Sequence, residues 1–95
     1  MAGWDLRLRF VNVTLSPASV AANTSAEELF AVPGVRLDDL VLAANKPAAQ
    51  AGLGIVGVRV SSEGNIGITF GNFTGSAITP TASEVYSVAL LTKQP

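Results

Sequence analysis

Apolar and polar residues alternate with a period of two along most of this 95-residue chain. Turn-forming residues interrupt the alternation at intervals of roughly ten residues, the spacing typical of sandwiches and small barrels. Because successive side chains of a strand point to opposite faces, each alternating segment predicts a strand with one buried face. The predicted strands cover residues 4–15, 25–32, 39–44, 53–60, 65–71 and 84–92. We therefore predict a single all-β domain over residues 1–95, a small antiparallel β-sandwich or jelly-roll-like barrel of six to eight short strands.

The first predicted strand has the clearest alternation. Leu6, Leu8 and Phe10 lie on one face, whereas Arg7 and Arg9 lie on the other, which we interpret as the solvated face. Between residues 10 and 11 the apolar phase changes, which predicts a bulge or a change of partner sheet.

Trp4 continues the apolar side of this segment toward the N-terminus, and Asp5 continues the charged side. Residues 1–15 are thus either the first strand or an arm that lies on a neighbouring molecule. Trp and Arg are enriched where interfaces carry most of their binding energy. Two readings of the arginines remain open, a solvated face or pairing with acidic groups of a partner subunit. The candidate interface comprises Trp4, Leu6, Arg7, Leu8, Arg9 and Phe10.

Turn signals divide the rest of the chain. Residues 25–32 separate their faces less cleanly and have some helical propensity, but Pro33-Gly34 ends the segment early, which favours a strand. Residues 45–52 lack a period of two and predict a crossover loop. Residues 61–65 predict a hairpin turn with a glycine at positive φ.

The charged fraction is only 14%, the net charge is −1, and Cys and His are absent. These counts exclude disulfides, zinc and iron–sulfur sites built on Cys, thiol nucleophiles and His-based triads. Nucleic-acid binding is not expected, because no basic patch exists. So few charges favour a surface covered by other copies or by a partner, although a monomer with a Ser, Thr and Asn surface is the alternative.

Gly52, Gly54 and Gly57 match the pattern G-x-G-x-x-G. A dinucleotide site needs a strand before this motif and a helix after it, whereas here a loop precedes it and a strand follows. We interpret these glycines as allowing a bend, a bulge or a close backbone approach.

Neither the acidic residues nor the glycosylation sequons predict a site. The adjacent acidic pairs at 27–28 and 38–39 would point to opposite faces of strands, which does not suit a catalytic dyad. The sequons at residues 12, 23 and 72 are not preceded by a signal peptide. No apolar run is long enough to span a membrane. We expect no enzyme activity, no cofactor or metal, and no small-molecule substrate, nucleic-acid or membrane partner.

Most of the chain after residue 15 resembles a group of small tailed-phage virion proteins. The resemblance lies in turn and strand pieces rather than in chemical motifs, so it supplies no catalytic or ligand residue. The matching pieces are residues 15–24, Asn45-Lys46-Pro47, 51–56, Arg59-Val60-Ser61, 66–72, Ile78-Thr79-Pro80 and 83–88.

Some members of this group are capsid decoration, or cement, proteins. The resemblance implies a non-enzymatic virion protein, made in the host bacterial cytoplasm, that binds the major capsid protein on the capsid exterior as a homo-oligomer. The alternative is a tail or head-fibre module that binds a host glycan or a protein receptor. A third reading is a β-sandwich adaptor in some other bacterial assembly. The small number of aromatic residues, 6% of the chain, argues against a glycan site.

Overall fold

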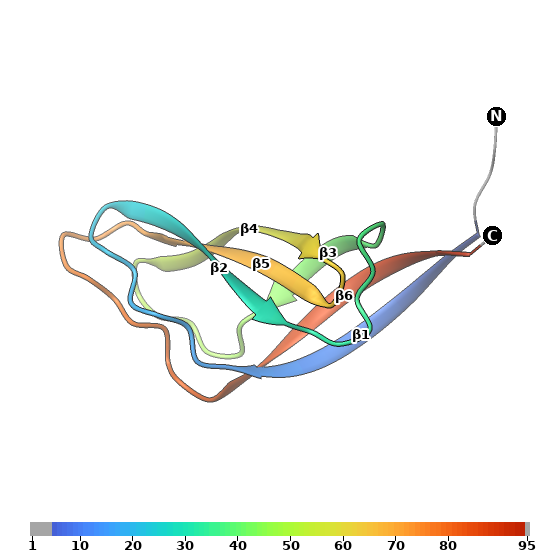
Figure 1. Ribbon diagram of the computed structural model, residues 1–95. Helices are drawn as coiled ribbons and strands as arrows, with labels where there is room; N and C mark the ends of the chain where they lie inside the picture. The colour runs from blue at the N-terminus through green and yellow to red at the C-terminus, as the bar shows by residue number, and fades with distance from the viewer. Residues whose placement is uncertain (1–4, 95) are drawn as a thin grey trace.

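The computed structural model describes residues 5–94, and over this range the chain is a six-stranded β-sandwich without helices (Figure 1). The first sheet has the order β1-β6-β3 and the second the order β2-β5-β4, with all pairs antiparallel. The predicted all-β antiparallel class is confirmed. The strands are β1 (Asp5–Leu15), β2 (Thr24–Ala31), β3 (Leu40–Asn45), β4 (Leu53–Ser62), β5 (Asn65–Asn72) and β6 (Glu84–Gln94).

The register of β1 is regular from end to end. Asp5 faces Gln94 and Leu15 faces Glu84, with no irregularity between them. The prediction of a bulge or a change of partner sheet between residues 10 and 11 is therefore wrong, because β1 pairs with β6 throughout. Odd- and even-numbered residues keep their own sides of β1 throughout. Only the side that carries the apolar residues changes between residues 10 and 11. Leu6, Leu8 and Phe10 point outward, whereas the odd-numbered residues from Val11 onward point inward.

Bulges occur instead in the strands beside the two central strands. The β3 register shifts between Val41 and Ala43, and the β4 register shifts between Ile55 and Gly57 and again near the hairpin. Val41 and Ala44 both pack against the core. The two residues between them, Leu42 and Ala43, are exposed on the outside of the sheet.

The core lies between the sheets and is built mainly from the central strands. Phe70 of β5 and Tyr86 of β6 meet edge to face, with ring centroids 6.5 Å apart and planes at 86°. Burial of the apolar side chains between the sheets supplies most of the driving force for folding. The buried apolar residues are Leu15, Val20, Val32, Val35, Ile66, Ile68, Phe70, Tyr86, Val88 and Leu90.

The predicted turns form as expected. Gly34 has φ 94° after Pro33, and Gly64 has φ 78° in the β4–β5 hairpin. Residues 45–52 carry the chain from one sheet to the other, and residues 25–32 form a strand rather than a helix. The β4 bulge agrees with the structural interpretation of the glycine pattern.

Buried Asn72 ties together the loops at the end of the sandwich away from the hairpin. Its Nδ2 donates to the carbonyl oxygens of Val20 and Ser76, at 3.0 and 2.8 Å. Its Oδ1 accepts from the backbone nitrogen and the hydroxyl of Thr74, at 2.9 and 2.8 Å. Both the Nδ2 donor and the Oδ1 acceptor of this buried amide therefore have the hydrogen-bond partners that buried polar groups need.

Candidate functional site

The outer surface of the β1-β6-β3 sheet carries a continuous set of apolar side chains, which we call the apolar face. Cross-strand partners lie on the same side of a sheet. Leu8 is opposite Leu91, which is opposite Leu40, and Phe10 is opposite Ala89, which is opposite Ala43. The apolar face consists of Leu6, Leu8, Phe10, Leu40, Leu42, Ala43, Ala89 and Leu91.

The large side chains of the apolar face are uncovered. Phe10 is 72% exposed, Leu6 and Leu40 are each 58% exposed, and Leu8 and Leu42 are exposed by half or slightly more. A half-exposed leucine presents on the order of 100 Å² of apolar surface, so these five residues together expose about 500 Å², which is in the upper part of the range for the largest apolar patch on a monomer. A patch of this size is often functional, which makes the apolar face a candidate interaction surface.

Arg7 and Arg9 lie on the opposite side of β1 from the apolar face, as the alternation requires. Their interpretation as a solvated face is wrong for Arg9, whose side chain is only 32% exposed and turns inward over the sandwich. Arg7 stays exposed. Trp4, the remaining member of the candidate interface, lies outside the described residues.

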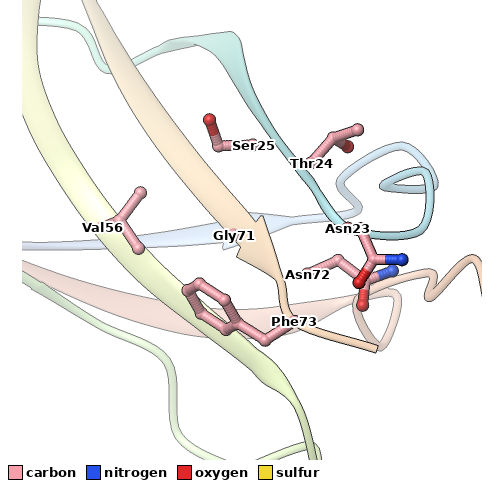
Figure 2. A pocket seen from close by; sticks show the side chains of 7 residues that line it. All are labelled: Asn23, Thr24, Ser25, Val56, Gly71, Asn72 and Phe73. Atoms are coloured by element: carbon pink, nitrogen blue, oxygen red, sulfur yellow. The ribbon is translucent and has the colours of Figure 1, made fainter. Parts of the chain in front are cut away.

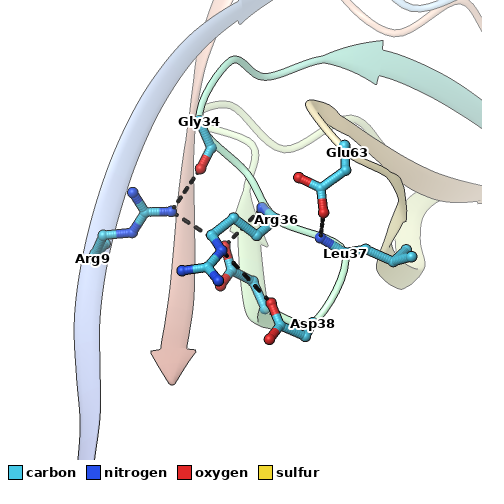
Figure 3. A network of polar contacts seen from close by, with 7 residues as sticks. Arg9, Gly34, Arg36, Leu37, Asp38 and Glu63 are labelled. Atoms are coloured by element: carbon cyan, nitrogen blue, oxygen red, sulfur yellow. Dashed lines mark hydrogen bonds and ion pairs between the residues drawn. The ribbon is translucent and has the colours of Figure 1, made fainter. Parts of the chain in front are cut away.

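Arg9 enters a polar network with the turn before β3 (Figure 3). Its Nη2 donates to the carbonyl oxygen of Gly34 at 3.2 Å and to Oδ2 of Asp39 at 3.3 Å. The Asp39 side chain is fully buried and also accepts from the backbone nitrogen of Arg36 at 3.0 Å. A buried carboxylate needs such partners, so this network holds the turn against β1.

The outer surface of the β2-β5-β4 sheet is different, because its central strand presents glycines there. Glu27 of β2 reaches across Gly67 of β5 to Arg59 of β4, with bonds of 2.7 and 2.8 Å. A side chain at position 67 would collide with the Glu27 carboxylate. The hydrogen bonds from Arg59 lower the pKa of Glu27, and the same pairing raises the pKa of Arg59.

A shallow depression of about 490 Å³ lies at one end of this second sheet (Figure 2). Its floor includes Gly71, and an added Cβ there would lie 2.9 Å from Cζ of Phe73 and 3.0 Å from Cγ1 of Val56. Phe73 is 71% exposed, and Asn23 and Ser25 line the depression from β2 and the preceding turn. One exposed ring beside polar side chains suits a small polar ligand with an apolar face.

Titratable groups do not gather at either surface. Within residues 5–94, no three His, Cys, Asp or Glu side chains are placed to hold a metal ion. The same part of the chain contains no helix with the length and hydropathy needed to cross a membrane. The acidic residues are dispersed: Glu27 pairs with Arg59, Asp39 with Arg9, and Glu84 with Lys46 at 2.8 Å.

Comparison with protein-family models, with curated proteins and with solved structures finds no match to this chain. The surfaces described above therefore carry the functional argument together with the sequence resemblance.

Sequence reasoning placed Leu6, Leu8 and Phe10 on one side of β1, and that grouping agrees with the structure. It missed Leu40 and Leu91, which complete the apolar face. The period of two contained a usable signal, since β1 and β6 each have apolar residues on both sides of the strand. A strand at the edge or middle of a two-layer sandwich has only one core-facing side, so one apolar side of each must face outward.

Proposed function

We propose that this chain is a non-enzymatic structural protein of a tailed-phage particle that binds the outer surface of the capsid and stabilises it. Its partner is the major capsid protein, and its site of action is the capsid exterior after synthesis in the bacterial cytoplasm. The observation that carries the proposal is the apolar face, a large uncovered surface on a domain with few charges. The resemblance to phage virion proteins is the reason for proposing a phage capsid as the assembly that this face contacts.

The physical case rests on the kind of contact that a lattice offers. Burial of apolar surface is non-directional and needs no reactive group. The apolar face occurs on a sheet whose inward side is already packed, so covering it requires no rearrangement of the core. Many copies on one lattice then stabilise it together, because each contact that forms holds its neighbours in place.

Co-sedimentation tests this proposal. Purified protein is added to capsids that lack it, and the bound fraction and the temperature of capsid opening are measured. We expect binding and a higher opening temperature. Phe10→Ser should reduce binding at least about tenfold, since removing a buried aromatic anchor costs 2 kcal/mol or more.

Phe73→Ser is the matched control. Phe73 and Phe10 are 71% and 72% exposed, so the two changes remove similar apolar surface, but Phe10 lies in β1 and Phe73 in the loop that follows β5. Phe73→Ser should leave capsid binding unchanged. If the native protein does not bind capsids, the proposal is wrong, and if Phe73→Ser is the variant that loses binding, the apolar face is not the contact.

A tail or head-fibre module that binds a host glycan or a protein receptor is the second candidate. The depression beside Phe73 favours it, because an exposed ring flanked by Asn23 and Ser25 could stack on one face of a sugar while polar groups meet its hydroxyls. Retention on host cells or immobilised glycans that Phe73→Ser abolishes, without binding to capsids, would support this function instead.

A further inference from the structure

One edge of the β1-β6-β3 sheet is open along the whole of β1. β6 lies on one side of β1, and no strand lies on the other side within the described residues. β1 has 11 residues, contains no proline and runs in unbroken register. A long regular edge presents a row of unpaired N–H and C=O groups, which is a template for another strand.

The other three edges carry features that discourage pairing. β3 has a bulge and lies beside β4. β4 has two register shifts of its own. β2 is shorter, and the segment that follows β1 reaches it through a 2.7 Å hydrogen bond from the Ala18 nitrogen to Glu28. Because proteins protect edges in these ways when they must stay unpaired, the unprotected β1 edge stands out.

We propose that the β1 edge pairs with β1 of a second copy of this chain, antiparallel and about a two-fold axis. Charge selects this occupant and this direction. Asp5 and Arg7 lie on one side of β1, both are exposed, and neither has a partner among residues 5–94. Reversing the second strand brings Asp5 of each copy toward Arg7 of the other, which opposite charges favour and a parallel arrangement does not provide.

The axis falls at Leu6. An axis at Leu6 sets Asp5 opposite Arg7 of the second copy. An axis at Arg7 would oppose two like charges directly, which is destabilising. An axis at Leu8 would set Arg7 of each copy directly opposite Arg9 of the other, which is unfavourable for the same reason. The axis at Leu6 also keeps the even-numbered apolar residues of both copies on the same side.

The pair forms one continuous six-stranded sheet, in the order β3-β6-β1 followed by β1-β6-β3 of the second copy. Its apolar faces join into one surface of twice the size, which remains free to bind a larger partner. This inference does not depend on the proposed function, because pairing occurs without a capsid, and its test uses the isolated protein.

Single-cysteine cross-linking gives the test, since the native chain has no Cys. The variants are Leu6→Cys, Leu8→Cys, Phe10→Cys and Asn12→Cys, all on the outward side of β1. Directly opposed strands place Cα atoms 4.5–5.5 Å apart, which suits a disulfide. Each residue away from the axis separates the two equivalent positions by about 7 Å more.

We expect efficient disulfide formation at Leu6, a steep decrease at Leu8, and none at Phe10 or Asn12. Leu40→Cys, on the apolar face but in β3, is the control and should not cross-link. Equal cross-linking at Leu6 and Leu40 would mean that two copies pack face to face, and a flat or absent profile along β1 would likewise overturn the proposal.

Charge exchange provides the second measurement, with the dimer fraction read by sedimentation of cysteine-free protein. Arg7→Asp should weaken association several-fold, because it opposes acidic residues across the new strand pair. The double variant Asp5→Arg/Arg7→Asp should restore it. Failure of the double variant to recover, or a native protein that sediments only as a monomer, contradicts pairing of the β1 edges.

Discussion

Asp39 Oδ2 lies 3.3 Å from Nη2 of Arg9, and this contact joins the first strand to the turn before β3 across 30 positions of sequence. The carboxylate is fully buried, whereas the guanidinium is 32% exposed. Removing the Asp39 carboxylate leaves the Arg9 charge and the Arg36 backbone N–H without this acceptor. The Arg9–Asp39 pair, which we call the clamp, therefore stabilises the fold rather than forming a binding site.

Asp39→Ala should lower the free energy of unfolding by about 3 kcal/mol, the usual cost of breaking a buried charge pair. Asp38→Ala is the control one residue away. Asp38 is half exposed, and its contact with Arg36 is 3.8 Å long, so its loss should change stability by less than about 0.5 kcal/mol. Urea unfolding of both variants measures the difference, and equal effects would show that the clamp contributes nothing.

Substitutions at Leu8 and Leu90 test which side of the β1-β6-β3 sheet faces the core. Leu90 is fully buried, whereas Leu8 is 54% exposed on the apolar face. Leu90→Ala should cost 2–5 kcal/mol through lost burial and a residual cavity, and Leu8→Ala about 0.5 kcal/mol or less for the monomer. Thermal unfolding at low protein concentration compares them. A large cost at Leu8 with a small one at Leu90 would mean that the assigned faces are reversed.

Substitutions at Gly52 and Gly64 distinguish the cost of backbone strain from the cost of a steric collision. Both have positive φ, of 77° and 78°. An added Cβ at Gly64 meets nothing within 4 Å, whereas at Gly52 it collides with Cγ2 of Thr74. Gly64→Ala should therefore cost about 1 kcal/mol, and Gly52→Ala clearly more.

Thr74→Ser provides the rescue for this comparison. Serine removes the methyl group but keeps the hydroxyl that bonds Asn72 and Ser76. In the Thr74→Ser background, the cost of Gly52→Ala should decrease toward that of Gly64→Ala. An unchanged cost in that background would assign the penalty to something other than the methyl contact.

Tyr86 should give the protein an alkaline stability limit. Burial, with a smaller contribution from the charges of Glu84 and Glu28, raises its pKa from 10.0 to about 12. Between these values an unfolded chain releases the phenol proton while the folded chain retains it. Stability is therefore fully present below pH 10 and decreases toward pH 12, by on the order of 2 kcal/mol.

Tyr86→Phe isolates this effect, because Tyr86 is the one tyrosine in the sequence. Its hydroxyl is buried without a hydrogen-bond partner among residues 5–94, so the variant should be as stable as the native protein at pH 7 or slightly more stable. It should also lose the extra decrease above pH 10. Ultraviolet absorbance of the phenolate follows the titration directly, and a midpoint near pH 10 in the folded protein would contradict the raised pKa.

Local patterns were sufficient to predict the strands and several turns. The backbone conformations at Pro33-Gly34 and Gly64 follow from the residue types themselves, since glycine accepts positive φ without strain. The strand at residues 25–32 was also predictable, because the turn that ends it leaves too little length for a stable helix.

The orientation of β1 was not predictable in the same way. Alternation separates Leu6, Leu8 and Phe10 from Arg7 and Arg9, but it does not say which side meets the core. That choice depends on partners far along the chain, namely Asp39 for Arg9 and the β6 residues opposite each leucine. The bulges in β3 and β4 are likewise set by packing against neighbouring strands rather than by a local signal.

The strand order of the first sheet also determines when that sheet can form. β1 and β3 both pair with β6, which the ribosome makes after them, so neither has its neighbour during most of synthesis. Contacts as distant as Asp5 with Gln94 carry a large loop-closure entropy and slow folding. Until β6 arrives, β1 exposes both its edges together with its apolar residues. Folding speed and chaperone protection of the nascent first strand should therefore limit the yield of soluble protein more than the stability of the finished sandwich does.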